Sequence, residues 1–156
     1  MKRPPLWAVI IGTGFGSGFW PWGPGTAGAL LATLLWLAGS LVMSAQTLFW
    51  LTLGLIIVFT AAGTIATNRL EPYWGEDPKR VVVDEMIGVW VPLLACPASH
   101  VGWAAAAFIL FRFFDILKPL GIRWFDRQHG GFWVQADDLV AGIYSLFLIL
   151  LAQWAI

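Results

Sequence analysis

Two pairs of adjacent carboxylates stand out in a chain that is otherwise poor in charge. Asp84-Glu85 and Asp137-Asp138 each come directly before an apolar run. Acids at such places can cap a helix, because its first turn exposes free N–H groups and a positive partial charge. Two such pairs together with Asp115 favour a second interpretation, because clustered carboxylates repel one another unless a cation joins them. Mg²⁺ prefers these hard oxygen ligands, so we expect a Mg²⁺ site built from Asp84, Glu85, Asp115, Asp137 and Asp138.

A stripe of charge is expected near one end of an apolar helix. Arg112, Asp115 and Lys118 are three residues apart, a spacing that places side chains on one helix face. They can neutralise one another, with Lys118 extending toward the membrane surface. Arg112 lies nearly two turns inside the apolar segment, where a charge is costly and indicates function. We expect Arg112, with Lys118 or Arg123, to bind a phosphate group, and Asp115 to bind metal or orient Arg112.

A glycine-rich stretch, residues 12–18, is followed by Pro24-Gly25-Thr26. Such a loop can offer backbone N–H groups to an anion just before a helix begins. It can equally be a flexible loop that packs on the helices. It lacks the third glycine of a dinucleotide-binding fingerprint and the lysine of a P-loop. The hydroxyl groups of Thr13, Ser17 and Thr26 are candidate contacts to a substrate phosphate.

His129 lies in a loop that returns toward Asp137. It is a candidate general acid, general base or metal ligand, although a lone histidine in a loop is more often a bystander. No Ser-His-Asp arrangement accompanies it, so the sequence does not support a serine nucleophile. The candidate catalytic residues are Asp84, Glu85, Arg112, Asp115, His129 and Asp138.

The composition indicates a membrane protein. Of the 156 residues, 59% are hydrophobic and 12% are charged, against roughly 25% charged in a soluble domain. A chain this short cannot bury so much apolar surface in a water-soluble globule. The zero formal net charge gives no support to a nucleic-acid partner. The length fits one domain, residues 1–156.

Four apolar segments approach the roughly 20 residues that cross a bilayer core. They are Gly28 to Met43, Leu48 to Thr67, Val101 to Leu117 and Leu139 to Ile156. A fifth, Met86 to Cys96, is short and contains Pro92. Several tryptophans, among them Trp20 and Trp22, stand where such segments would meet the membrane surface.

The placement of charge decides how often the chain crosses. Basic residues concentrate in the connections 68–85 and 118–136, and the positive-inside rule places both in the cytoplasm. Only five crossings satisfy this. We therefore predict an all-α, polytopic membrane helical bundle of about five segments, with one short or re-entrant. Every acidic residue then lies near one membrane face. Asp84-x-x-x-Gly88 and Asp138-x-x-x-Gly142 each add a glycine that lets another helix approach.

In their order, these motifs resemble the phosphatidylglycerophosphatase A family of bacterial membrane phosphatases. No single motif is specific, but the ordered set extends over residues 12–142. The sequence departs from the family at Gln135-Ala136, at Ala29, where serine is common, and in a slightly shortened loop around His129. The matching pieces are Gly12-Thr-Gly-Phe-Gly-Ser-Gly18 with Pro24-Gly-Thr26, Val83-Asp-Glu-x-x-Gly88, Phe111-Arg-Phe-Phe-Asp-x-x-Lys-Pro119, Ile122-Arg-Trp-Phe-Asp126, and Gly130-Gly131 before Asp137-Asp-x-x-Ala-Gly142.

The resemblance implies an activity and a location. It implies Mg²⁺-dependent hydrolysis of the terminal phosphomonoester of phosphatidylglycerophosphate, which leaves phosphatidylglycerol. It also implies a multi-pass protein of the bacterial inner membrane, and the predicted topology puts the active site on the cytoplasmic side. The expected partners are the lipid substrate and the bilayer, and the sequence carries no signal for an oligomeric state.

Two other functions fit parts of the pattern. An alcohol phosphatidyltransferase also uses metal-bound carboxylates at a membrane, but its Asp-Gly-x-x-Ala-Arg motif is absent. A small membrane transporter would place polar or charged residues near the middle of the membrane, whereas the long apolar segments are nearly free of them. A structural membrane protein without activity would leave the ordered motifs unexplained. A lipid phosphatase is therefore the preferred interpretation.

Overall fold

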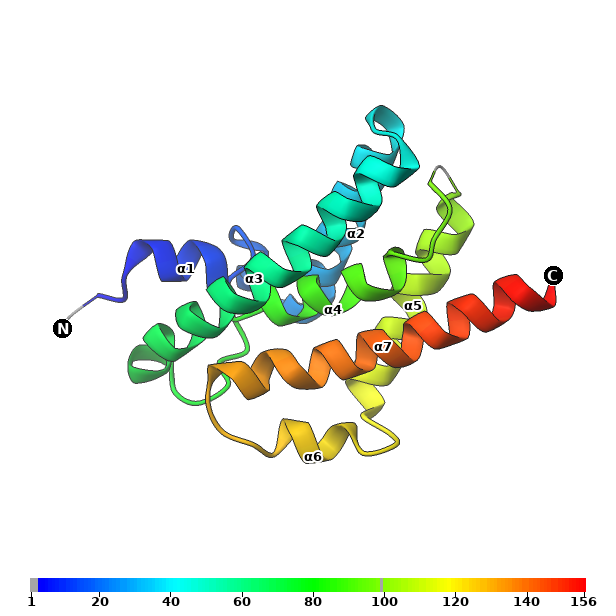
Figure 1. Cartoon of the computed structure of the whole chain (residues 1–156). Coiled ribbons are helices and arrows are strands. Elements are labelled where there is room, and N and C mark those ends of the chain that lie inside the picture. Colours follow the sequence, from blue (N-terminus) through cyan, green and yellow to red (C-terminus); the bar gives the residue numbers. More distant parts are fainter. Residues whose placement is uncertain (1–2, 99) are drawn as a thin grey trace.

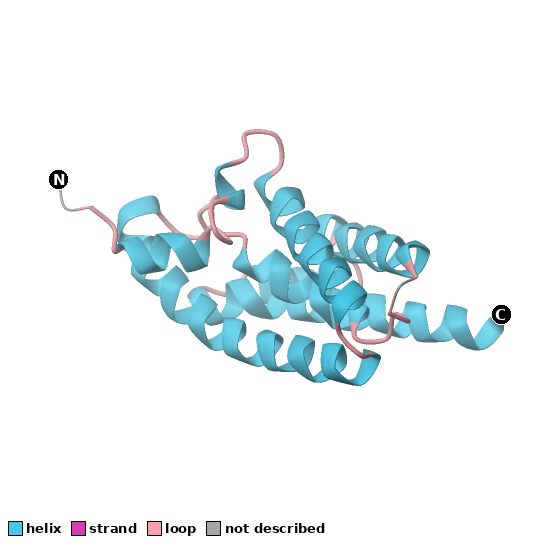
Figure 2. Cartoon of the chain, turned by 90° about the horizontal axis from the view of Figure 1, so that it is seen from above, coloured by secondary structure: helices cyan, strands magenta, loops and turns pink. Residues whose placement is uncertain are grey.

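The computed structural model describes residues 3–98 and 100–156. Within these ranges the chain forms seven α-helices and one short 3₁₀ turn, with no strand (Figure 2). The predicted all-α bundle is thereby confirmed. The elements are α1 Leu6–Gly12, η1 Ser17–Phe19, α2 Pro24–Val42, α3 Ala45–Trp74, α4 Val83–Leu93, α5 Val101–Leu117, α6 Ile122–Asp126 and α7 Gly131–Ala155.

Three helices, α2, α3 and α7, are long and apolar enough to cross a bilayer. The 17 residues of α5 rise roughly 25 Å and the 11 residues of α4 about 16 Å. Since the apolar core of a bilayer is about 30 Å thick, α4 cannot cross it alone. The expectation of about five segments with one short therefore holds approximately.

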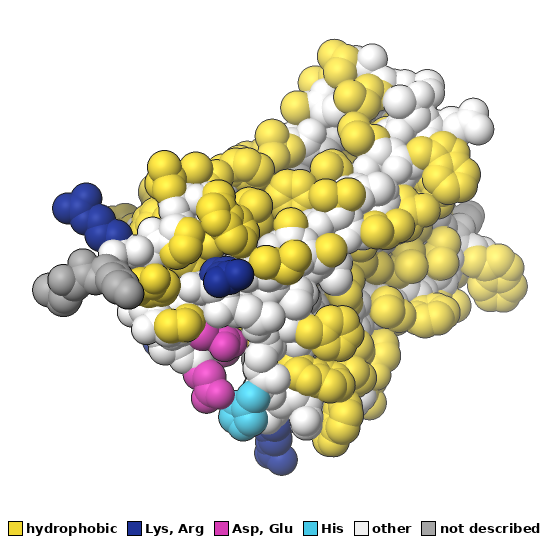
Figure 3. Space-filling model, turned by 60° about the vertical axis from the view of Figure 1, so that its left-hand side comes forward, with side chains coloured by type: hydrophobic (Ala, Val, Ile, Leu, Met, Phe, Trp, Pro, Cys, Tyr) yellow, Lys and Arg dark blue, Asp and Glu magenta, His cyan; other side chains and the backbone are white. Residues whose placement is uncertain are grey.

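The five longest helices run between two ends of the molecule (Figure 1). The starts of α2, α4 and α7 and the end of α5 line one polar cavity. At the other end, the α2–α3 connection lies beside the residues that follow α4, and Gln153 near the end of α7 donates to the carbonyl oxygen of Ala95 at 2.8 Å. On the face seen in Figure 3, the Asp, Glu and His side chains gather near one end and hydrophobic side chains cover most of the rest. This distribution suits a bundle embedded in lipid.

The short helix α4 forms the centre of the bundle and contacts α2, α3, α5 and α7 (Figure 1). Every residue of α4 except Glu85 is buried. Trp90 Nε1 donates to the carbonyl oxygen of Ala32, 3.2 Å away, and so ties α4 to α2. Because protein and not lipid surrounds α4, its turns need not match the bilayer thickness. The short predicted segment is therefore a buried core helix.

The close crossing of α4 and α7 depends on two glycines. A Cβ on Gly88 would overlap the ring of Phe111 and lie 2.8 Å from the carbonyl oxygen of Asp138. A Cβ on Gly142 would overlap the carbonyl oxygen of Gly88. The two Asp-x-x-x-Gly motifs thus mark the crossing, as expected. Each acid lies one turn before its glycine, so the crossing brings Asp84 and Asp138 into one cavity.

Helix α7 begins at Gly131, eight residues before the expected start of the last apolar segment. The backbone N–H of Gly131 donates to Asn68 Oδ1 on α3 at 2.7 Å. This polar contact anchors the first turn of α7, which hydropathy alone does not reveal. Asp137-Asp138 therefore lies nearly two turns inside the helix and not at its start, so capping does not explain this pair.

Replacing Gly142 with leucine should force α4 and α7 apart, because even a Cβ overlaps the opposite backbone. We expect a loss of about 1–3 kcal/mol in the free energy of unfolding, the usual cost of overpacking. Thermal unfolding in detergent would show it as a lower midpoint. Gly54→Leu is the matched control, since nothing lies within 4 Å of a Cβ there. An equal drop in both variants would contradict the tight crossing.

Candidate active site

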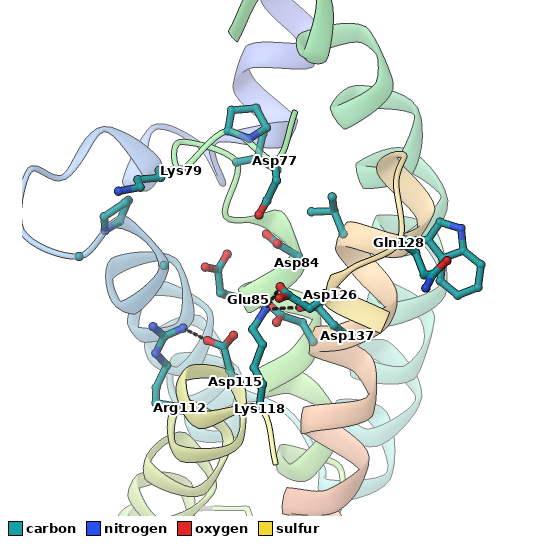
Figure 4. Close-up of a pocket in the computed structure, with 18 residues that line it drawn as sticks. Asp77, Lys79, Asp84, Glu85, Arg112, Asp115, Lys118, Asp126, Gln128 and Asp137 are labelled. Carbon is teal, nitrogen blue, oxygen red and sulfur yellow. Dashed lines mark hydrogen bonds and ion pairs between the residues drawn. The ribbon is translucent and has the colours of Figure 1, made fainter. Parts of the chain in front are cut away.

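A polar cavity of about 300 Å³ opens where the helix ends converge (Figure 4). Its walls come from the start of α2, the loop before α4, the end of α5, and the first turns of α7. The lining residues are Gly23, Pro24, Gly25, Asp77, Pro78, Lys79, Val81, Asp84, Glu85, Arg112, Asp115, Lys118, Asp126, Gln128, Trp133, Val134, Asp137 and Asp138.

Three carboxylates converge in this cavity, and we call them the carboxylate triad: Asp84, Glu85 and Asp138. Each offers one oxygen atom, and these atoms lie within 4.8 Å of one another. Asp84 and Asp138 are only 8% and 3% exposed. One buried oxygen of each triad member has no hydrogen-bond partner among the residues that the structure describes. Because unpaired buried carboxylates are costly, the triad is a candidate site for a cation.

Glu85 owes its position to a glycine at the start of α2. A Cβ on Gly25 would overlap Glu85 Oε1 and lie 3.3 Å from Arg112 Nη1. The first turn of α2 can therefore approach both charged groups only without a side chain at this position. Glycine in the Pro24-Gly25-Thr26 motif thus makes room for the site.

Arg112 and Asp115 form an ion pair on α5, in which Arg112 Nη1 donates to Asp115 Oδ2 (Figure 4). Their side chains are 15% and 11% exposed. Arg112 Nε is buried and has no partner within the described ranges. Of the two roles expected for Asp115, the geometry favours the orientation of Arg112 toward the cavity over membership of the triad.

Lys118, which directly follows α5, contacts acids of both α6 and α7. Its Nζ donates to Asp126 on α6 and lies 2.5 Å from Asp137 Oδ2 on α7 (Figure 4). Burial by itself lowers the pKa of Lys118, but the hydrogen bonds to these two carboxylates outweigh burial and raise the pKa above its ordinary value. The ammonium group therefore stays charged. Lys118 neutralises the charge of Asp126 and Asp137 at the cavity wall. It also lines the cavity in which we expected a phosphate to bind.

Four of the predicted phosphate contacts, Thr13, Ser17, Thr26 and Arg123, lie outside the cavity. The Thr13 hydroxyl donates to the carbonyl oxygen of Val9 in α1 at 2.7 Å, and the Ser17 hydroxyl donates to that of Gly14 at 2.9 Å. Arg123 donates to the carbonyl oxygen of Leu117 at 3.4 Å. Carbonyl oxygens close by in the sequence therefore accept hydrogen bonds from Thr13, Ser17 and Arg123. A fourth predicted contact, Thr26, is exposed on the outer side of α2.

The glycine-rich loop supports the site by packing. A Cβ on Gly18 would overlap the carbonyl oxygen of Arg80. The backbone N–H of Val82 donates to the carbonyl oxygen of Gly12 at 2.8 Å. The loop thereby holds the segment that leads into Asp84. Of the two interpretations offered for the loop, the structure supports packing against the helices.

His129 lies beside the carboxylate cavity and not in it. Its side chain is 79% exposed, and its Nδ1 is 3.0 Å from Glu76 Oε1. Both residues line a neighbouring cavity that shares Asp77, Asp126, Gln128 and Val134 with the polar one. The imidazole therefore contacts Glu76 at the surface, outside the carboxylate triad.

Several cavity residues were not singled out from the sequence as site residues. Asp126 is the last residue of one of the ordered motifs, and this position could have indicated that it belongs to the site. Asp77, Lys79, Gln128 and Trp133 belong to loops or first turns without a distinctive pattern. Lys79 is exposed at the cavity and forms no ion pair within the described part of the chain. It is thus a cation available to an incoming anion.

Fold and cavity together define a class: a helical membrane protein with a charged polar cavity at one end of its bundle. The chain belongs to the phosphatidylglycerophosphatase A family, whose model matches residues 10–153. The resemblance seen in the ordered motifs is confirmed, and the protein is a membrane lipid phosphatase.

Three curated relatives are similar over most of their length. Phosphatidylglycerophosphatase A of Escherichia coli is 37% identical over 87% of this chain and 77% of its own. The protein of that name from Haemophilus influenzae is 36% identical over 93% and 88%. A Bacteroides thetaiotaomicron protein, provisionally named a phosphatidylinositol-3-phosphatase, is 54% identical over 100% and 99%. No solved structure shows significant similarity.

The site geometry predicts different effects on activity for substitutions at Arg112 and at His129. We expect Arg112→Lys to slow phosphate release from a lipid phosphomonoester by roughly 100-fold, because lysine lacks the planar fork that holds Asp115 and phosphate together. His129→Ala should stay close to the wild-type rate, because the imidazole is outside the cavity. Phosphate release by purified variants with unchanged elution profiles measures both. Strong loss in His129→Ala with a normal rate in Arg112→Lys would contradict the arrangement.

Proposed function

We propose that this protein removes the terminal phosphate of phosphatidylglycerophosphate, with Mg²⁺, at the cytoplasmic face of a bacterial inner membrane. The observation that carries the proposal is the carboxylate triad, whose unpaired buried oxygens face the same cavity as Arg112. A cation-demanding cluster beside a guanidinium group suits a phosphomonoester. The two relatives named phosphatidylglycerophosphatase A support the choice of head group.

The donor set fits Mg²⁺. The carboxylate triad offers only hard oxygen atoms, with no histidine or cysteine within the group of three. Mg²⁺ is commonly held by few protein carboxylates and completes its shell with water and substrate phosphate, whereas zinc favours nitrogen and sulfur. Asp84, Glu85 and Asp138 would hold the ion. Once bound, it would neutralise phosphate charge and lower the pKa of a bound water.

The side chains of the chain itself bind and orient the phosphate. Arg112, held by Asp115, directs its guanidinium into the cavity, where donors stabilise the charge of a transferring phosphoryl group. Lys79 attracts the anionic head group at the mouth. Lys118 cancels the charge of two wall carboxylates, which would otherwise repel the phosphate. In the hydrolysis, water adds to phosphorus, the bond to the glycerol oxygen breaks, and that oxygen takes up a proton.

The position of the cavity suits a lipid substrate. It opens at an end of the bundle, so the head group can enter while the acyl chains remain in the bilayer. The cavity is formed by connections that carry most of the basic residues, and the positive-inside rule places such connections in the cytoplasm. This supports an active site on the cytoplasmic side.

A second candidate substrate is a phosphoinositide that carries a 3-phosphate. The relative that is 54% identical bears a provisional name for that activity. Both substrates present a phosphomonoester on the polyol head group of a phospholipid. Arg112 and the carboxylate triad would bind the phosphate group of either substrate. Discrimination between the substrates must therefore come from contacts to the polyol part of the head group.

A head-group comparison tests the proposal. Purified protein in detergent should release phosphate from phosphatidylglycerophosphate with Mg²⁺, lose this activity on chelation, and regain it when Mg²⁺ returns. Phosphatidylinositol 3-phosphate at the same surface concentration should react more slowly. Faster release from the phosphoinositide would favour the second candidate. Release that persists in chelator would refute the metal-dependent site.

A further inference from the structure

An apolar groove on the outer side of α2 meets the polar cavity. It encloses about 310 Å³ and extends along α2 from Gly23 to Leu34. Gly23 lines both the groove and the cavity that holds the carboxylate triad. The two spaces therefore adjoin at the start of α2. This continuity gives a lipid a path from the polar site to the bilayer.

The floor of the groove is a regular apolar stripe. Ala27 is three and four residues before Leu30 and Leu31, and Leu34 is four and three residues after them, so the four side chains lie on one face of α2. Leu30 and Leu34 are 46% and 54% exposed, although α2 is long enough to cross a bilayer. From Ala27 to Leu34 the stripe rises roughly 10 Å. An exposed apolar stripe of this length matches a hydrocarbon chain that lies along the helix.

Two tryptophans mark the polar end of the groove. Trp20 and Trp22 contact each other edge to face, with ring centroids 6.0 Å apart. They are 55% and 81% exposed and line the groove beside Gly23. Tryptophan is enriched where a membrane meets water. The pair therefore places the junction of cavity and groove at the level of the lipid head groups.

Thr26 supplies the polar side chain at this junction. Its Oγ1 would lie 3.5 Å from a Cβ on Gly23, the residue that the two spaces share. The hydroxyl therefore lies in the groove, beside the residue at which the groove and the polar cavity meet. In a phospholipid, the ester linkages occupy the corresponding position between head group and chains. Thr26 is thus placed for an ester and not for the phosphate that the sequence suggested.

We propose that this groove holds one acyl chain of the lipid substrate, with Thr26 beside its ester linkage. The inference rests on the proposed function, because the phosphorylated head group must occupy the polar cavity at the same time. A second apolar cavity of about 300 Å³ lies between α2, α3 and α4, near Leu35 and Trp36. It shares no lining residue with the polar cavity, so a chain there would be disconnected from the phosphate.

A chain-dependent kinetic comparison tests the groove. Ala27→Trp fills it, so KM for diacyl phosphatidylglycerophosphate should rise about tenfold, the equivalent of roughly two buried methylene groups. The value of kcat should not change, because the groove binds ground state and transition state alike. The deacylated head group, which has no chain, should react with Ala27→Trp as with the wild type. Thr26→Val should show the same selective pattern.

Leu35→Trp is the matched control, on the same helix but in the second apolar cavity. Leu35→Trp should leave KM and kcat unchanged for both the diacyl and the deacylated substrate. A chain-dependent effect in Leu35→Trp and none in Ala27→Trp would overturn the proposal. An equal loss of activity toward both substrates in Ala27→Trp would also overturn the proposal, since the variant would then disturb the polar cavity.

A binding measurement separates this inference from the proposed function. In chelator, where turnover stops, phosphatidylglycerophosphate with a photoreactive acyl chain should label residues 27–34 more than a phosphatidylcholine probe does. Ala27→Trp should abolish the excess. Wild-type protein that releases no phosphate from the diacyl substrate would refute the proposed function. Uniform labelling of the bilayer-facing helices by both probes would refute the groove.

Discussion

A carboxylate buried without a positive partner is among the most costly groups that a protein can carry, and three lie together in this cavity. Arg112 and Lys118 already compensate the carboxylates of α5, α6 and the adjacent turn of α7. The carboxylate triad has buried oxygens with no partner among the described residues. A bound cation would neutralise these oxygens, and the Mg²⁺ site that we propose rests on this unbalanced negative charge.

Close backbone approach makes this concentration of charge possible. Gly88 and Gly142 let α4 cross α7 and so bring the acids of two distant motifs together. Gly25 lets the start of α2 approach Glu85 and Arg112. Because α4 is enclosed by other helices, its charged end is anchored by protein while the outer faces of the bundle remain apolar. The same construction places the polar cavity at one end of an apolar bundle.

Hydropathy and motif order predicted much of the fold, and local polar contacts account for the differences. The apolar segment 101–117 coincides with α5, since both ends are marked by polar residues. The start of α7 was missed because Asn68, 63 residues away in sequence, anchors it. The paired acids indicated the cluster of carboxylates, of which Asp84, Glu85 and Asp138 converge. Sequence could not show that Lys118 is engaged by two carboxylates, because that depends on how α6 folds back.

Cation binding by the carboxylate triad is the central claim, and it can be measured without substrate. Electron paramagnetic resonance would follow Mn²⁺ binding to purified protein and its displacement by Mg²⁺. We predict saturable, Mg²⁺-competed binding in the wild type and in the control Glu76→Gln, whose carboxylate pairs with the exposed His129. Asp138→Asn should bind at least roughly tenfold more weakly. Equal Mn²⁺ affinity in Asp138→Asn and the wild type would contradict the account.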